Sequence, residues 1–549
     1  MLISPLGDSA ILIRLGDGVD AVLFGRARAL AREIETHPPP GMSDVVSAFA
    51  CVAVFFHRPP SDWAALEQDL AACGARMESA PAELGPARTV DIPVCYGGEC
   101  GPDLEGVARH TALSVEQVVA AHHCADYRVH AIGFLPGFPY LGGLPPVLAT
   151  PRRSTPRPAV PAGAVGIGGA QTGVYPLGSP GGWNLIGRTP LRLFDAMRDE
   201  PALVHVGDRV RFSPISVGEF TRRAAAEADR PSPAQGDAVD SAPNALTIRR
   251  AGMLTTVQDL GRVGHRRQGV PVSGAVDPFA LRLANVLVGN ADDAAGLEFT
   301  LVGPELEFRE GALVALGGGD FGVPRWRPFW VAAGETLRLG PAQTGCRGYL
   351  AVAGGIAVAP VLGSRSTYVR AGLGGWGGRA LRDGDVLPLP RVIRRVVGHW
   401  RIDPRILPEY TSDPEVRVTA GAHIHEFGEE WEGEAFDVTP QSDRMGLRLG
   451  GACVPRGSGG DVTSLPISPG TVQVPPDGHP IVLLADAQTV GGYPHLAHAV
   501  AVDLPLLAQL RPGDSVTFTL VSLQEASECW QARERALGLL REGLAQKLA

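Results

Sequence analysis

The sequence predicts a mainly β fold with α+β parts, built as two halves joined by a linker. The 549-residue chain contains 70 Gly and 48 Pro, and folds of many short strands need many turns. Short alternating runs between Gly/Pro turns dominate after residue 124. Several motifs also recur in the same order in both halves, which indicates related β-barrels repeated along the chain.

The first 88 residues predict a small α+β domain. Strand-like runs cover Ala10–Leu15 and Val45–Phe56, and helix-like patterns cover Ala21–Glu35 and Asp62–Met77. Residues 89–225 predict a β-barrel that includes a helical stretch from Ser114 to Cys124. That stretch opens with Ser114 and Gln117 at the spacing of a capping box.

Residues 226–245 predict a linker, because Glu227–Asn244 lacks periodicity and large apolar residues and is rich in Pro, Ala, Ser and Asp. The second half, 246–549, predicts tandem β-barrels that end in a helix over Gln524–Leu548. The repeated motifs pair residues 163–167 with 470–474, 170–172 with 487–489, and 207–212 with 513–518, and weaker copies of the last lie at 334–339 and 384–389.

The charge composition excludes several classes of function. A net charge of −9 argues against a nucleic-acid surface, which needs clustered positive charge. The chain has a single lysine, Lys547, so a phosphate-loop lysine, a Schiff-base lysine and a biotin-carrying lysine are excluded elsewhere.

Cysteine spacing and hydropathy predict a cytoplasmic protein. Eight cysteines are scattered without a C-x-x-C pair, which favours neither a zinc ribbon nor a disulfide framework. The N-terminus lacks a basic segment followed by an apolar one, as a secretory signal would need. The longest mainly apolar run, Val45–Phe56, is too short to cross a bilayer as a helix.

Candidate binding residues in the first half lie in two Gly-rich segments. Phe138 and Tyr140 could form pocket walls, and a purely structural role at barrel corners is equally well supported. Polar groups suited to a small amide or carboxylate are provided by Gln171, Tyr175, Asn184, Arg188 and Thr189. Arg188 could form a forked contact with a carboxylate, and the alternative is an ordinary ion pair.

The second half offers candidate acids. Gln258 and Asp277 could serve binding and base catalysis, but turn and helix-cap roles are favoured there about two to one. Stronger candidates combine acids, amides, a hydroxyl and an arginine on expected strand ends. We take Asp443 and Asp486 as acid/base candidates, and the accompanying binding residues as Ser442, Arg444, Gln488, Thr489 and Tyr493.

Two motifs lack the context that their function requires. Gly372, Gly374 and Gly377 form a G-x-G-x-x-G pattern without a clear strand before it or a long helix after it, so a dinucleotide fold is not predicted. His423 and His425 could present two imidazoles on one face of a strand, but no third ligand is evident. No metal ligand is assigned.

The same segments carry a resemblance to known families. Residues 123–145, 150–195 and 207–215 resemble the allophanate hydrolase subunit 1 family, which includes the B subunit of 5-oxoprolinase. Residues 255–290, 442–451 and 471–494 resemble the companion subunit 2 family, which includes the C subunit of 5-oxoprolinase, and the carboxyltransferase region of urea amidolyases.

The resemblance implies cyclophilin-like β-barrels in both halves and a natural fusion of the B and C subunits. It also implies ATP-dependent hydrolysis of the 5-oxo-L-proline lactam to L-glutamate, with the separate, ATP-using A protein of 5-oxoprolinase as partner. We therefore expect no covalently bound cofactor in this chain, and ATP used by the partner. The oligomeric state stays open, a homo-oligomer included.

Two other functions are compatible with the same resemblance. The first is a biotin-dependent carboxyltransferase that acts on urea or a related amide, with the biotin carrier supplied in trans. The second is a binding module that regulates a histidine kinase. It ranks third, because fusion of an inhibitor with its antagonist would make such regulation awkward. None of the three functions involves nucleic acid or a membrane as partner.

Overall fold

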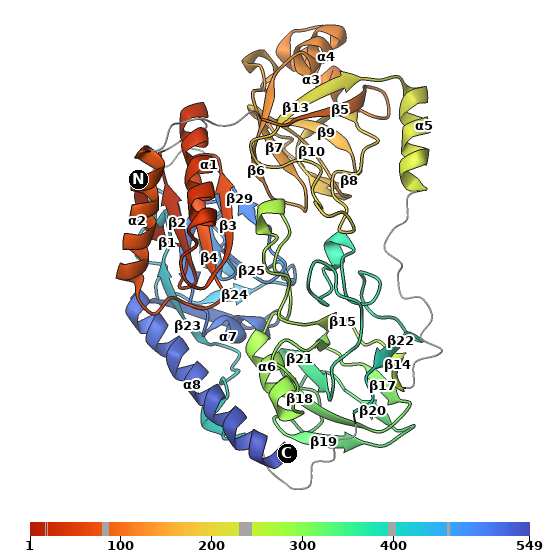
Figure 1. The fold of residues 1–549 in the computed structure, drawn as a ribbon, viewed down its shortest axis with the longest axis vertical. Coiled ribbons are helices and arrows are strands. Elements are labelled where there is room, and N and C mark those ends of the chain that lie inside the picture. The colour runs from red at the N-terminus through yellow and green to blue at the C-terminus, as the bar shows by residue number, and fades with distance from the viewer. Residues whose placement is uncertain are drawn as a thin grey trace.

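The computed structural model describes residues 1–548 except 17, 19, 80–86, 230–243, 393–401 and 458–461. Most of the predicted linker thus lies outside the described residues. Figure 1 shows the first-half barrel above, the second-half sheets below it, and the N-terminal domain beside the C-terminal barrel. None of the described helices combines the length and hydropathy of a membrane span.

The N-terminal domain is a four-stranded sheet with two helices on one face. The strand order is β1-β2-β4-β3. The elements are β1 (Leu2–Pro5), β2 (Ala10–Arg14), α1 (Ala21–Thr36), β3 (Met42–Ala48), β4 (Cys51–Phe56) and α2 (Trp63–Ser79). The apolar run expected as one strand over Val45–Phe56 is instead a hairpin. It turns at Phe49, whose φ is 51°, and Phe49 N–H donates to the carbonyl of His130 at 3.1 Å.

The first half continues into a closed seven-stranded barrel in the order β10-β7-β6-β13-β5-β12-β9. Its strands are β5 (Thr89–Tyr96), β6 (Tyr127–Ile132), β7 (Pro139–Gly142), β9 (Ala164–Gly168), β10 (Gln171–Val174), β12 (Asn184–Arg188) and β13 (Arg209–Pro214). Helices α3 (Leu104–Thr111), α4 (Val115–His123) and α5 (Val217–Ala228) and the small sheet of β8 (Arg157–Val160) and β11 (Ser179–Gly181) accompany it. The capping box predicted at Ser114 is present in α4.

Residues 244–392 form two sheets around one hydrophobic core, where the sequence led us to expect the first of two tandem barrels. The four-stranded sheet contains β14 (Asn244–Arg250), β17 (Glu305–Phe308), β20 (Thr336–Arg338) and β22 (Val386–Leu389). The five-stranded sheet contains β15 (Leu254–Gln258), β16 (Gly296–Thr300), β18 (Ala312–Asp320), β19 (Pro328–Val331) and β21 (Thr344–Val352), and α6 (Pro278–Leu287) packs on it.

A second closed seven-stranded barrel follows, in the order β23-β30-β27-β28-β25-β24-β31. Its strands are β23 (Glu415–Ala420), β24 (Phe436–Val438), β25 (Gly446–Gly451), β27 (Thr471–Gln473), β28 (Ile481–Leu483), β30 (His495–Ala499) and β31 (Ser515–Leu520). The small ladder of β26 (Leu465–Pro466) with β29 (Val490–Gly491) adjoins it, and α7 (Leu504–Gln509) and the long α8 (Leu523–Leu548) complete the chain.

The repeated Gly-Asp motifs explain why the two barrels are alike. In the first barrel, the turn at Gly207 leads into β13, which pairs parallel with β5. In the second, the turn at Gly513 leads into β31, which pairs parallel with β23. Both barrels are therefore closed in part by the same parallel contact, as related units require. Cyclophilin-like β-barrels are present in both halves of this mainly β chain.

The two halves pack closely through polar and aromatic contacts. The carboxylate of Asp8 accepts the N–H of Ala501 at 2.8 Å, and that of Asp44 accepts the N–H of Gly264 at 2.9 Å. Arg266 lies 4.3 Å from the centroid of the Phe55 ring. These contacts join residues more than 200 positions apart, so the halves form one packed body.

Candidate active site

The structure brings two sequence candidates together in a buried charge network. Arg444 Nε donates to Asp486 at 2.9 Å, and Nη2 donates to the same carboxylate at 3.1 Å. Nη1 pairs with Glu298 on β16, and Ser273 Oγ donates to Asp486 at 2.6 Å. Burial opposes the charge on Arg444, but Asp486 and Glu298 outweigh it and raise the pKa of Arg444. The network therefore links the C-terminal barrel to the five-stranded sheet.

Asp277 and Gln258 lie inside the protein. Asp277 is the N-cap of α6, where it accepts the N–H of Ala280 at 2.9 Å and the hydroxyl of Tyr410 at 2.6 Å. Burial raises its pKa. Gln258 is also fully buried and donates to Thr256 at 3.0 Å. The cap role weighed for Asp277 is thus observed, and its catalytic role stays a prediction.

Asp443 lies in an exposed turn beside the network. Its Oδ1 accepts the N–H of Met445 at 2.7 Å, and its Oδ2 accepts no hydrogen bond among the described residues. Ser442 Oγ accepts the N–H of Arg448 at 3.0 Å in the same turn. Asp443 therefore offers solvent the more accessible of the two candidate carboxylates.

The motif around Asp486 continues into the β29 ladder. The hydroxyl of Thr489 is buried without a hydrogen-bond partner, and Gln488 is partly exposed. Tyr493 has 43% of its surface exposed, and its carbonyl accepts from Gln473. These residues lie on the side of the C-terminal barrel that faces the first half, because β29 pairs with β26, whose Leu465 packs in the core between them.

The aromatic candidates of the first half are core residues at the interface. Phe138, Tyr140 and Tyr175 are buried and pack edge to face with Trp183. Their cluster includes Leu465 and Val490 of the second half, and residues of the N-terminal domain. The Gly-rich turn around Gly137 supports the same interface, because its N–H donates to the carbonyl of Gln268 at 2.8 Å. The structural role weighed for these turns thus includes docking of the two halves.

The polar candidates of the first barrel make local contacts. Asn184 donates to the carbonyl of Pro151 at 2.8 Å, and Thr189 is buried and accepts the N–H of Leu191. Arg188 Nε donates to the carbonyl of Ala162 at 2.8 Å, and its guanidinium lies 5.7 Å from the centroid of the Phe220 ring. Gln171 begins β10 and pairs with Gly168. Within the described part of the chain, these side chains therefore stand apart from the Asp486 network.

A cavity of about 730 Å³ lies at the junction of the N-terminal sheet and the C-terminal barrel. That volume suits a small-molecule ligand, and domain interfaces are common places for such sites. Arg14, Phe49 and Cys51 line this interface cavity from the first half. His423, His425 and Arg456 line it from the second, as does Leu465 next to β29.

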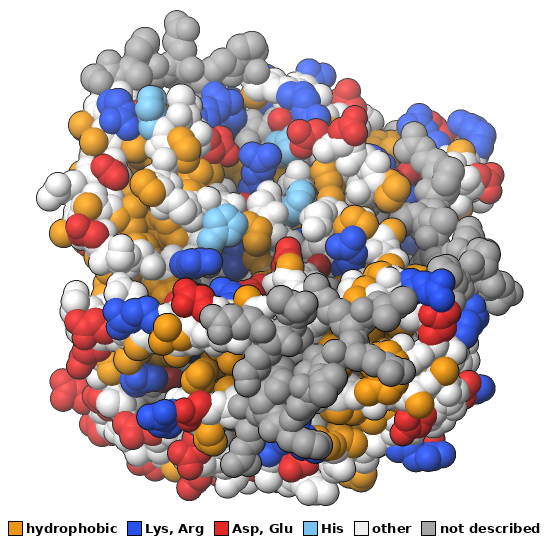
Figure 2. Space-filling view, turned by 60° about the horizontal axis from the view of Figure 1, so that its bottom comes forward, with side chains coloured by type: hydrophobic (Ala, Val, Ile, Leu, Met, Phe, Trp, Pro, Cys, Tyr) orange, Lys and Arg blue, Asp and Glu red, His pale blue; other side chains and the backbone are white. Residues whose placement is uncertain are grey.

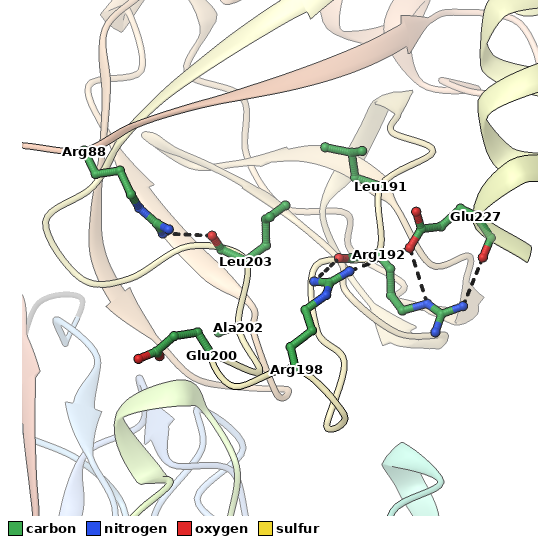
Figure 3. A pocket seen from close by; sticks show the side chains of 8 residues that line it. All are labelled: Arg88, Leu191, Arg192, Arg198, Glu200, Ala202, Leu203 and Glu227. Atoms are coloured by element: carbon green, nitrogen blue, oxygen red, sulfur yellow. Dashed lines mark hydrogen bonds and ion pairs between the residues drawn. The ribbon is translucent and has the colours of Figure 1, made fainter. Parts of the chain in front are cut away.

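Smaller cavities are lined mainly by residues of the first half. One of about 310 Å³ lies beside the first barrel (Figure 3), and its charged groups already pair with each other. For example, Arg192 Nε and Arg198 Nη2 each lie 3.7 Å from the same carboxylate oxygen of Glu227. Another of about 360 Å³ is lined by Arg28 and Arg267. On the face drawn in Figure 2, acidic and basic side chains are interspersed.

Several site residues were not singled out from the sequence. Ser273 joins the Asp486 network, and Arg14 and Arg456 line the interface cavity. Glu298 and Arg262 lie in the same acid-rich segment as Gln258 and Asp277, and Arg262 is fully buried near Asp486 with two guanidinium nitrogens that lack hydrogen bonds. Single arginines and serines carry no local signal of their partners, because those partners lie far away in the chain.

Among the residues that the structure describes, no group of three or more His, Cys, Asp or Glu side chains could hold a metal ion. His423 caps the start of a 3-10 turn over Ile424–Glu426, and His425 lies within that turn. The two histidines are therefore not on the strand that the sequence had suggested. Both nevertheless line the interface cavity.

The chain combines two closed barrels with a cavity at the interface of its halves. Comparison with protein-family models identifies the class of protein to which this arrangement belongs. Residues 1–204 match the family described as "Carboxyltransferase domain, subdomain C and D". Residues 268–520 match "Carboxyltransferase domain, subdomain A and B". The chain belongs to this carboxyltransferase-domain family, and within it to the group of the B and C subunits of 5-oxoprolinase, here in fused form.

Individual relatives support this assignment. The chain is 42% identical over 303 residues to the 5-oxoprolinase C subunit of Escherichia coli K12, covering 53% of this chain and 96% of that protein. It is 43% identical over 233 residues to the 5-oxoprolinase B subunit of Bacillus subtilis, covering 40% of this chain and 94% of that protein. The crystal structure of TTHA0988 is 38% identical, with a TM-score of 0.79 over 93% of this chain and 99% of that one.

A more distant relative is much longer. Urea amidolyase of Lachancea kluyveri is 34% identical over 344 residues, which cover 57% of this chain but 19% of that protein. The relation to the carboxyltransferase region of urea amidolyases is therefore shown, together with the relation to the 5-oxoprolinase proteins.

Proposed function

We propose that this chain is the B–C component of an ATP-dependent 5-oxoprolinase. It would open the lactam of 5-oxo-L-proline to L-glutamate together with a separate protein like the ATP-using A component. The observation that carries this proposal is that the chain spans nearly the whole length of relatives of both the B and the C type. The packing of both halves around one interface cavity supports a shared function.

The chemistry divides naturally between two proteins. A lactam is a stable amide, and transfer of the ATP γ-phosphoryl group to its oxygen gives an activated imidate and ADP. Water then attacks the ring carbon, and cleavage of the C–N bond gives γ-glutamyl phosphate. A second water hydrolyses this acyl phosphate to glutamate and phosphate. This step needs a base that takes a proton from the water and a donor that stabilises the oxyanion. We place ATP on the partner protein and no covalent cofactor on this chain.

Asp443 and Asp486 remain the proposed acid and base residues. Asp443 has a free carboxylate oxygen in an exposed turn, which suits a base that receives a proton. Asp486 is held by Arg444 and Ser273, which fixes the orientation of its carboxylate. Arg188 stays a predicted carboxylate contact on the first barrel, apart from this network.

The decisive experiment adds the purified chain to the A-type partner protein with ATP and 5-oxo-L-proline and measures glutamate release. We expect the release rate to rise with added chain, and no increase would refute the proposal. Asp443→Asn and Arg188→Ala then test the site: loss of a general base lowers rates by about 10²- to 10⁴-fold. Unchanged rates in both variants would overturn this site assignment.

A second function is favoured by the description of the matched family. In it, the chain would transfer a carboxyl group from carboxybiotin to urea or a related amide. The carrier would have to act in trans, because Lys547 is the only lysine. Transfer of ¹⁴C from carboxybiotin to urea, with no glutamate release from 5-oxo-L-proline, would support this function over the first.

A further inference from the structure

The interface cavity carries an unpaired positive charge. Arg14 is the last residue of β2, and its side chain makes no hydrogen bond or ion pair among the described residues. Its Nε is buried without a partner. A buried guanidinium nitrogen without an acceptor is costly, so this position favours an anion.

Among the described residues that line the cavity, no other charge neutralises Arg14. Glu426 is the one carboxylate among the described lining residues, and it is already paired with Arg456 at 2.5 Å. His425 adds a further nitrogen base from the same turn. The net charge of the described lining residues is thus positive, which suits a ligand with one carboxylate.

His423 supplies a fixed hydrogen-bond donor to the same cavity. Its Nδ1 accepts the N–H of His495 at 3.1 Å, which places the proton of the neutral ring on Nε2. Burial lowers the pKa of His423; Glu426 opposes this, while Arg14 and Arg456 add to it. The ring therefore stays neutral near pH 7, and Nε2–H is free to donate to a carbonyl oxygen.

We propose that the interface cavity binds a small carboxylate that also carries an amide carbonyl, with Arg14 binding the carboxylate and His423 Nε2–H donating to the carbonyl. Arg14 comes from the N-terminal domain and His423 from the C-terminal barrel, so the site is complete only when both halves are docked. The identity of the ligand as 5-oxo-L-proline rests on the proposed function, but carboxylate binding does not.

Calorimetric titration of the full chain with 5-oxo-L-proline tests the proposal, and 2-pyrrolidone serves as the ligand without the carboxylate. We expect the wild-type protein to bind 5-oxo-L-proline at least about tenfold more tightly than 2-pyrrolidone. Arg14→Gln should weaken 5-oxo-L-proline binding about 10- to 100-fold and leave 2-pyrrolidone binding unchanged, and Arg14→Lys should restore part of the loss. His423→Phe should weaken the binding of both ligands.

Arg28→Gln is the matched control, because Arg28 also lacks a hydrogen bond among the described residues but lines a different cavity. Equal binding in wild type and Arg14→Gln, loss of binding only in Arg28→Gln, or no binding by the wild type at millimolar ligand would overturn the proposal. Thermal unfolding checks that each variant is folded.

Glutamate release with the A-type partner protein separates the two proposals. Normal release by Arg14→Gln, with an unchanged KM, would refute the cavity assignment and keep the function. Tight binding without any release by the wild type would refute the function and keep the carboxylate site. We expect Arg14→Gln to raise KM more than it lowers kcat.

Discussion

Arg444 holds Asp486 through two hydrogen bonds, with Nε 2.9 Å and Nη2 3.1 Å from its carboxylate oxygens. The same guanidinium also binds Glu298, so one cation pairs with two buried carboxylates. Replacing Arg444 with Met would leave both carboxylates buried and unpaired. We expect Arg444→Met to cost about 3–5 kcal/mol of stability, as measured by urea unfolding.

Asp443→Asn is the control for that experiment. Asp443 neighbours Arg444 in sequence but lies in an exposed turn, and an amide oxygen can still accept the N–H of Met445. We expect the unfolding free energy of Asp443→Asn to stay within about 0.5 kcal/mol of that of the wild type. A loss as large as that of Arg444→Met would show that the turn, and not the charge network, supports this region.

A glycine substitution tests the packing of the two halves. A Cβ on Gly133 would lie 2.6 Å from Cβ of Val490 in the second half. Gly133→Ala should therefore force the halves apart locally and cost about 1–3 kcal/mol, seen as a lower melting temperature. Gly538→Ala is the control, because nothing lies within 4 Å of its added Cβ and it lies in α8. It should be neutral or stabilising; a similar loss in both variants would contradict the packing argument.

The interface also predicts a dependence on pH. Burial raises the pKa of Asp8 from 3.8 to about 6. The folded protein then binds more protons than the unfolded chain between these values, so the contribution of Asp8 to stability falls as pH rises from about 4 to 6. Asp8→Asn, which keeps an acceptor for Ala501, should match wild type near pH 4 and exceed it above pH 6 by up to about 3 kcal/mol.

Thermal unfolding of both proteins across this pH range measures the difference. A wild-type protein that is more stable than Asp8→Asn at neutral pH would show that the Asp8 carboxylate gains more from its hydrogen bond than it loses on burial.

The C-terminal helix should depend on one buried side chain. Leu537 is fully buried, whereas Leu539 on the same helix is 70% exposed. Arg282 also binds Glu534 of α8 through two hydrogen bonds of 2.6 and 2.8 Å. Leu537→Ala should cost about 2–5 kcal/mol and expose α8 to proteolysis, while Leu539→Ala should do neither. Equal protease sensitivity of the two variants would contradict the docking seen here.

Local patterns in the sequence predicted most elements well. The capping box at Ser114 and the helices near Ala21–Glu35 and Gln524–Leu548 are confirmed within a few residues. The sequence did not predict the hairpin within Val45–Phe56, because the turn at Phe49 contains no Gly or Pro. Long-range contact to His130 holds that turn instead.

The candidate site was harder to predict. Arg444 and Asp486 lie in the two motifs that the sequence singled out, and the structure joins them. Phe138 and Tyr140 pack in the interface core, which turn composition alone could not distinguish from a pocket wall. The sequence did not predict that Arg14 and His423 line the same cavity, because more than 400 residues separate them in the chain.

Local properties of the chain were enough to predict its two-part organisation, the relation between its barrels and its family, because periodicity, turn residues and repeated motifs can all be read along a segment. Which polar groups meet became clear only in three dimensions. Whether Arg14 is neutralised, or which carboxylate Arg444 holds, depends on how the two halves pack. Burial strengthens electrostatic interactions by removing water, and burial is a property of the packed fold and not of any short segment.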